Sequence, residues 1–139
     1  MMDAERDDYA ANLSGIAVHQ LHAGKADEDS QELARQLMAL ALHLSPRNKQ
    51  AVVLNAKLAQ GKVPPAPATD YRAETMARLL MERGKLLEKQ EGKENVELAG
   101  YFYQAAVELD PGNEDAIYLS ELYRINHDEV AWDLLMRNR

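Results

Sequence analysis

Two closely spaced histidines are the side chains of this sequence that could most readily hold a metal ion. His19 and His22 lie three residues apart and could share one face of a helix. With a carboxylate such as that of Asp7 or Asp8, two imidazoles could bind a transition metal in an enzyme. Two incidental histidines on a helix surface are the simpler interpretation, and we favour it. We therefore expect no bound metal and no other cofactor.

Other arrangements that could carry out catalysis are not indicated. The chain has no cysteine, which excludes disulfides, thiol nucleophiles and zinc sites with cysteine ligands. Its serines and glycines are scattered, and no glycine-rich phosphate loop is present. His127 precedes Asp128 and Glu129, but carboxylates at such a place are typical of a helix N-terminus. We expect a protein that is not an enzyme.

The composition favours an acidic protein built from helices. Of the 139 residues, 46% are hydrophobic and only 6% aromatic, and alanine and leucine are abundant. The net charge is −7, and residues 66–139, with 9 basic and 15 acidic side chains, contribute −6 of it. This charge disfavours nucleic acid or an anionic membrane as the main partner. MMDAERDDYA lacks an apolar run, so we expect no signal peptide, no membrane insertion and a cytoplasmic location, unless the chain is a fragment of a longer protein.

Hydrophobic periodicity predicts seven helices and no strands. The expected helices cover about residues 5–23, 30–44, 46–61, 70–90, 96–109, 111–125 and 128 to the C-terminus. Prolines are expected to open the third and sixth helices. The residues expected to cap the second, fourth and seventh helices are Asp29 or Ser30, Thr69 or Asp70, and Asn126 or Asp128. Between the third and fourth helices, KVPPAPATD is expected to be extended and exposed.

An internal repeat with a spacing of 65 residues connects the two halves of the chain. ARQLMALALHLSPRNKQA (34–51) and AGYFYQAAVELDPGNEDA (99–116) share three alanines, a leucine, a proline and an asparagine at equivalent positions. On a helix, Ala34 and Ala41 lie on one face and should be buried where a neighbouring helix approaches, as should Ala99 and Ala106. The repeat therefore predicts a helix–turn–helix unit that stacks on copies of itself.

These motifs resemble the tetratricopeptide repeat family over about residues 28–62 and 78–125. VELAGYFYQAAVELDPGN is similar to the second helix and exit of the family's unit, and LLMERGKLLEKQEG to its first helix. Both turns are longer than in the family, and Leu13 and Leu80 replace its first-helix aromatic residue. The resemblance implies an all-α, right-handed superhelix of about seven helices with an irregular two-unit array. The predicted parts are residues 1–62, a linker within the domain at 63–69, and residues 70–139.

The resemblance also implies a function, because members of the family bind peptides or helices in a concave groove. Positions that bind a terminal carboxylate in one variant are occupied here by Ser14, Val18, Leu54, Met81 and Lys85, so that clamp is not expected. The expected groove residues are Val53, Lys57, Arg78, Met81, Lys85, Tyr118 and Leu122, unless neighbouring helices bury several of them. We expect a non-catalytic scaffold with a protein or peptide partner. The alternative is a structural oligomerisation or spacer domain of a larger assembly.

The C-terminal segment EVAWDLLMRNR carries a second candidate interface. Trp132 and Met136 lie four residues apart and would form one stripe on a helix. An uncovered stripe containing tryptophan is typical of an association site, and we predict a homodimer through these two residues. The alternative is that Trp132 closes the end of the hydrophobic core.

Overall fold

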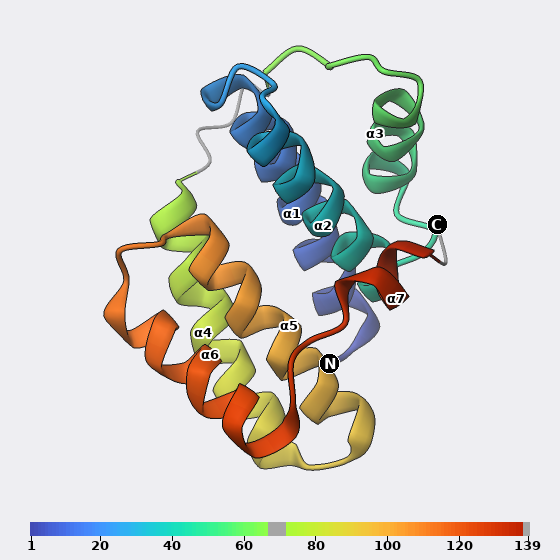
Figure 1. Ribbon diagram of the computed structural model, residues 1–139. Helices are drawn as coiled ribbons and strands as arrows, with labels where there is room; N and C mark the ends of the chain where they lie inside the picture. Colours follow the sequence, from blue (N-terminus) through green and yellow to red (C-terminus); the bar gives the residue numbers. More distant parts are fainter. Residues whose placement is uncertain (67–71, 138–139) are drawn as a thin grey trace. The chain divides into compact units, whose positions relative to one another are not determined.

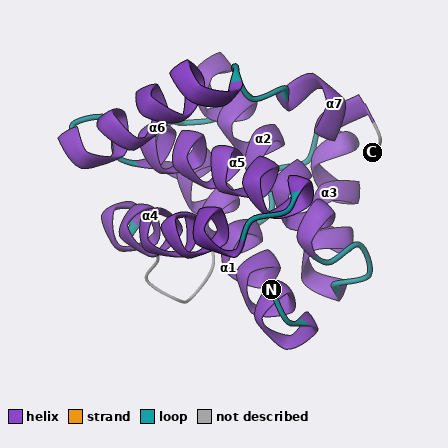
Figure 2. Cartoon of the chain, turned by 90° about the horizontal axis from the view of Figure 1, so that it is seen from below, coloured by secondary structure: helices purple, strands orange, loops and turns teal. Residues whose placement is uncertain are grey.

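The structure, a computed structural model, describes residues 1–66 and 72–137, and within these ranges it is entirely α-helical. Seven helices and no strand occur in these residues (Figures 1 and 2), which confirms the all-α prediction. None of the described helices is both long and apolar enough to cross a membrane. Contacts divide the chain into two compact units: Met1–Tyr71 with Asp133–Arg139, and Arg72–Trp132.

The first unit is built on a pair of helices, α1 (Asp3–Ala23) and α2 (Glu28–Leu44), which lie side by side in Figure 1. Both supply large side chains that are fully buried, including Leu13, Ile16, Leu37 and Leu40. The shorter α3 (Lys49–Ala59) contacts both helices, but Ala51 is its only buried residue. Helix α3 is therefore held by far less apolar burial than the pair on which it packs.

The second unit has the same order of elements, with α4 (Ala73–Gln90) paired to α5 (Lys93–Leu109) and α6 (Glu114–His127) packed on both. Its largest buried side chains are aromatic, Phe102 and Tyr103. The Tyr103 ring lies against Gly84, where an added Cβ would be 2.5 Å from the ring. Glycine at this position therefore lets α4 and α5 approach closely.

The repeat seen in the sequence is also a repeat in the structure. Helices α2 and α5 each contain 17 residues and begin and end 65 residues apart, as their bounds show. The alanines expected at close helix contacts are confirmed as buried: Ala34, Ala41, Ala99 and Ala106. The turn after each helix is also alike, because the next helix is capped by an asparagine in both units. The Asn48 side chain accepts a hydrogen bond from Ala51 N at 3.0 Å, and that of Asn113 accepts one from Ala116 N at 3.1 Å.

The helix starts differ from the prediction at these turns. Pro46 and Pro111 were expected to open helices, but both lie in the preceding turn, and α3 and α6 begin after the asparagines. The prediction is wrong because the Asn side chain satisfies a free N–H of the first helical turn, which proline cannot do. A proline two residues before the cap instead fixes φ within the turn.

Two further cap predictions are also corrected. Helix α2 is capped by Asp27, which accepts a hydrogen bond from Ser30 N at 2.8 Å, so Asp29 and Ser30 lie inside the helix. Helix α7 (Trp132–Arg137) starts later than predicted. Asp128 terminates α6 with φ at 100°, in the left-handed region that a continuing helix cannot use, and α7 begins only at Trp132. The caps expected at Thr69 and Asp70 lie outside the described residues.

The proline-rich segment after α3 is only partly as predicted. Residues 63–66 contain no helix, and Val63 is exposed, but Pro64 is buried. Its carbonyl oxygen accepts a hydrogen bond from His22 Nε2 at 2.7 Å, which ties the segment to the end of α1. The expectation of full exposure is therefore wrong at Pro64, while residues 67–69 of the predicted linker lie outside the described residues. The contacts also group Asp133–Arg139 with the first unit, whereas residues 70–139 were expected to form one unit.

Tyr123 attaches α6 to α5 by lying directly over a glycine. A Cβ added at Gly100 would lie 2.4 Å from Cζ of Tyr123, so the ring occupies the space of an ordinary side chain. The ring also meets Tyr103 edge to face, with centroids 6.3 Å apart.

We expect Gly100→Ala to be coupled to the size of residue 123. In the Tyr123→Leu background the change should stabilise the protein by about 1 kcal/mol, because alanine favours a helix. With Tyr123 present, overpacking should add a cost of roughly 1–3 kcal/mol. Urea unfolding of the four proteins measures this coupling. An equal effect of Gly100→Ala in both backgrounds would contradict the packing described.

Candidate functional site

An exposed apolar stripe runs along α6. Tyr118, Leu122 and Ile125 are 65%, 40% and 71% exposed, and their spacing of four and three residues places them on one side of the helix. The buried residues of α6, Ala116 and Tyr123, lie on the opposite side. We call the three exposed residues the α6 face. The α6 face presents large side chains for contact, while the buried residues on the opposite side hold the helix in place.

Carboxylates flank the α6 face. Glu114 precedes Tyr118 by four residues, and Glu121 precedes Ile125 by four, so both lie beside the stripe. Glu121 pairs with Arg124 at 2.8 Å, and this contact raises the pKa of the guanidinium. Across Arg72–Trp132 there are 7 basic and 13 acidic residues, a net charge of −6. The surroundings of the face are therefore negative.

The predicted groove residues are distributed over both units. Val53 and Lys57 are exposed on α3 of the first unit. On α4 of the second unit, Arg78 is exposed, and Lys85 is exposed and pairs with Glu82 at 3.0 Å.

Met81, also on α4, is only 5% exposed, as expected for a groove candidate that neighbouring helices bury. Tyr118 and Leu122 belong to the α6 face, and α6 contacts α4. Five of the seven residues thus lie on two neighbouring helices of the second unit, and the groove itself stays a prediction. Ile125 was missed, although its spacing from Tyr118 and Leu122 indicated the same face.

The positions that the sequence resemblance matched to a carboxylate clamp are largely covered. Ser14 and Val18 are buried in α1, and Ser14 Oγ donates a hydrogen bond to Ala10 O at 2.7 Å. Leu54 is half-buried. These side chains are apolar or already hydrogen-bonded, so their chemistry does not suit an anion.

The histidines have separate surroundings. His22 bonds to Pro64 O, and both ring nitrogens of His19 are buried without a hydrogen-bond partner among the described residues. His127 packs on Tyr123 with ring centroids 4.7 Å apart. Within residues 1–66 and 72–137, no three metal-binding side chains lie together. His19 and His22 therefore have no third ligand in this part of the chain.

Trp132 has a partner within the second unit. Its ring meets Tyr101 edge to face at 5.0 Å, and the Tyr101 hydroxyl donates a hydrogen bond to Ala131 O at 2.9 Å. Both rings are half-buried, so this contact packs Trp132 on α5, and the core-closing alternative stays a prediction as well. Met136 is half-buried and lines a pocket of the first unit. A homodimer through Trp132 and Met136 stays a prediction.

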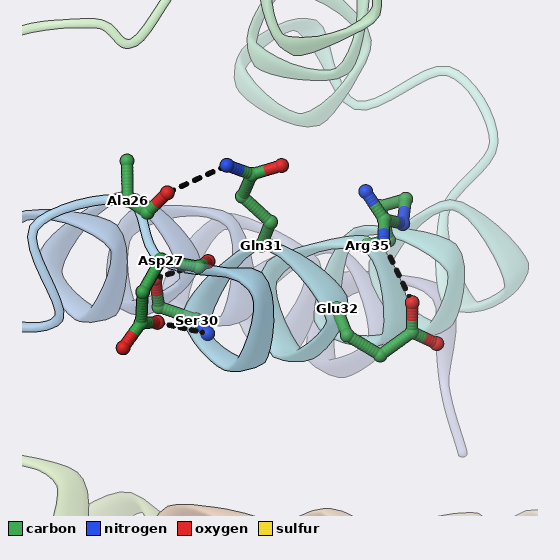
Figure 3. Close-up of polar contacts among 6 residues, drawn as sticks. All are labelled: Ala26, Asp27, Ser30, Gln31, Glu32 and Arg35. Atoms are coloured by element: carbon green, nitrogen blue, oxygen red, sulfur yellow. Dashed lines mark hydrogen bonds and ion pairs between the residues drawn. The ribbon is translucent and has the colours of Figure 1, made fainter.

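The pocket of the first unit lies between α2 and α3 and has a volume of about 430 Å³. Its walls come from the end of α1, one face of α2, the last turns of α3, the segment 61–63 and Met136. Figure 3 shows Gln31 and Arg35 on the same side of α2, one turn apart, both lining the pocket. Arg35 Nη2 pairs with Glu32 at 2.7 Å, and Gln31 Nε2 donates to Ala26 O at 2.5 Å.

A cluster of tyrosines occupies the corresponding region of the second unit. Tyr103 is 1% exposed, and its hydroxyl donates a hydrogen bond of 2.5 Å to Glu88 Oε1. Burial, followed by the contact with Glu88, raises the pKa of the Tyr103 phenol above its usual range. Burial also raises the pKa of Tyr123. In the folded protein both phenols therefore keep their protons to a higher pH than an exposed tyrosine does.

Comparison with known proteins provides no relative from which a site could be transferred. The chain matches no protein-family model, no curated protein and no solved structure. The two features that could bind a ligand are therefore judged on their own geometry and chemistry: the α6 face and the pocket of the first unit.

The raised phenol pKa values predict a loss of stability in alkaline solution. Because the pKa of Tyr103 is higher in the folded state, its contribution is fully present below about pH 10, the usual pKa of tyrosine, and falls as pH rises further. Urea unfolding between pH 8 and 11 should show this decrease. In Tyr103→Phe the decrease should be smaller, with Tyr123 supplying part of what remains. The same slope in both proteins would show that Tyr103 ionises freely in the folded state.

Proposed function

We propose that this protein is a tetratricopeptide-like helical repeat protein that acts as a non-catalytic interaction module. Two helical units spaced 65 residues apart support this proposal. Their second helices, α2 and α5, have the same length, and the turn after each of them ends in an asparagine cap. A right-handed superhelical arrangement is part of this proposal. The expected partner is a protein segment rather than a substrate that undergoes a reaction.

The α6 face is the observation that carries the proposal. Three large apolar side chains in one stripe are costly to leave in water and are typical of an interaction surface. An amphipathic helix recognises such a stripe through its own residues at positions i, i+3, i+4 and i+7. The flanking carboxylates select the charge of the partner, because like charges across an interface are unfavourable. We therefore propose an amphipathic peptide helix with basic residues beside its apolar stripe.

The carboxylates beside the α6 face also favour a basic peptide over a second copy of the chain as the partner. Two α6 faces brought together would place the carboxylates of Glu114 and Glu121 against those of the other copy. That repulsion disfavours self-association through this surface. The structural alternative, oligomerisation, would then need another surface, such as the predicted Trp132 and Met136 interface.

A designed peptide tests the proposed function directly. We expect a fluorescein-labelled amphipathic helix of leucine and lysine to bind, as measured by anisotropy. Leu122→Asp should weaken binding at least about tenfold, and Tyr118→Ala by a similar amount, because central apolar anchors carry most of an interface's binding energy. Added salt should weaken binding, since part of it is electrostatic.

Matched controls distinguish binding at the α6 face from nonspecific hydrophobic binding elsewhere on the protein. Leu86→Asp removes another exposed leucine of the same unit, from α4, and should leave the affinity unchanged. A leucine–glutamate peptide of the same pattern should bind much more weakly. Equal loss in Leu86→Asp and Leu122→Asp would refute the assignment to α6, and sedimentation of the free protein would show whether a homodimer competes.

A further inference from the structure

The repeat supplies an internal comparison for the pocket between α2 and α3. Subtracting 65 from Tyr123 gives Leu58, and from Gly100 gives Arg35, so the two pairs occupy equivalent places on equivalent helices. In the second unit the Tyr123 ring fills the space over Gly100. In the first unit the smaller Leu58 is combined with Arg35, and both residues line the open pocket.

A neighbouring pair of equivalent positions also has the smaller side chain in the first unit. Met38 is the equivalent of Tyr103, whose ring packs on Tyr123, and Met38 also lines the pocket. Two aromatic side chains of the second unit thus correspond to two aliphatic side chains in the first. The first unit has the same helical frame but lacks the rings that would fill it.

The polar contacts across the two helices also differ. In the second unit, Ser120 Oγ on α6 donates a hydrogen bond to Gln104 on α5 at 3.0 Å. The equivalent residues in the first unit are Asn55 and Ala39, and an alanine side chain cannot form that bond. Asn55 lines the pocket, and its side-chain amide can donate hydrogen bonds to a ligand there.

The charged side chains that line the pocket are cationic. Among the described residues these are Arg35 and Lys62, and no described carboxylate is a lining residue. Glu32 holds one side of the Arg35 guanidinium, but this exposed pair costs little to rearrange. The deeper wall is apolar, with Leu21, Ala34 and Met38 almost fully buried. An apolar interior with a cationic rim suits a ligand that has an apolar body and an anionic end.

We propose that this pocket binds a small aliphatic carboxylate. Its carboxylate would meet Arg35 and Lys62, with the Asn55 amide as a further donor, and its hydrocarbon chain would lie on Met38 and Leu58. The volume of about 430 Å³ lies in the usual range of small-molecule sites. Several chain segments form the walls of this partly open pocket, and its limited volume suits a compact ligand better than a long peptide. The site is separate from the α6 face and does not depend on the function proposed for it.

Titration calorimetry with sodium octanoate tests the proposal. We expect octanoate to bind to the full chain, octanol to bind more weakly, and octylamine to bind most weakly. Leu58→Tyr copies the filling residue of the second unit and should weaken octanoate at least tenfold. Val52→Tyr adds the same ring to an exposed position of α3 outside the pocket and should leave the affinity unchanged.

Arg35→Gln tests the charge and remains informative if Leu58→Tyr fails to fold. It should weaken octanoate about tenfold, as expected for a lost charge-assisted hydrogen bond, and leave octanol unchanged. Absence of octanoate binding, equal binding of octylamine, or unchanged affinity in both pocket variants would overturn the proposal. Tighter binding of a leucine-terminated tripeptide than of octanoate would also overturn it, in favour of a peptide terminus.

Discussion

The Asn-capped turn determines how the third helix of each unit leaves the helical pair. In both units the asparagine side chain accepts a hydrogen bond from the N–H three residues later. The backbone N–H of the same asparagine closes the preceding turn by donating to the carbonyl oxygen three residues earlier, that of Ser45 in the first unit and that of Asp110 in the second. These bonds satisfy donors that the first turn of a helix otherwise leaves free. Because the turn is the same, α3 and α6 start from equivalent places. The pocket in one unit and the α6 face in the other both depend on that start.

The two units have the same order of three helices but pack different side chains between them. A ring and a glycine in the second unit correspond to Leu58 and Arg35 in the first, and this is the main difference among several between the filled contact and the open pocket. The side chain of Tyr123 anchors α6 strongly enough to leave its outer face free for other contacts. In the first unit, α3 lacks this anchor and buries only Ala51. Differences at equivalent positions of the two units thus give each unit its own candidate ligand-binding surface.

The number of helices and the absence of strands from the described residues could be predicted from the sequence, because apolar periodicity and the positions of glycine and proline are local signals. Helix starts were less accurate, since Pro46 and Pro111 are typical of both a first helical turn and the turn before it. The shared Asn48 and Asn113 were visible, but their role depends on a side-chain bond. Tyr118 and Leu122 were recognised as candidate groove residues. The pocket could not be predicted, because it arises from the pairing of Leu58 with Arg35 across two helices, and no local pattern reports that pairing.

The first joint has a further support that explains how a weakly buried α3 keeps its place. Arg6 Nε donates a hydrogen bond to Leu44 O at 2.8 Å, and Asp7 accepts from Asn48 Nδ2 at 2.8 Å and Ser45 Oγ at 2.9 Å. The bond from Asn48, and then that from Ser45, lowers the pKa of Asp7. In the second unit Asn113 bonds instead to Asp110 of its own turn. Polar contacts from α1 therefore fix the first joint, whereas an aromatic ring fixes the second. Since polar contacts at the turn do not occupy the space between α2 and α3, the first unit can hold its third helix and still keep the pocket open.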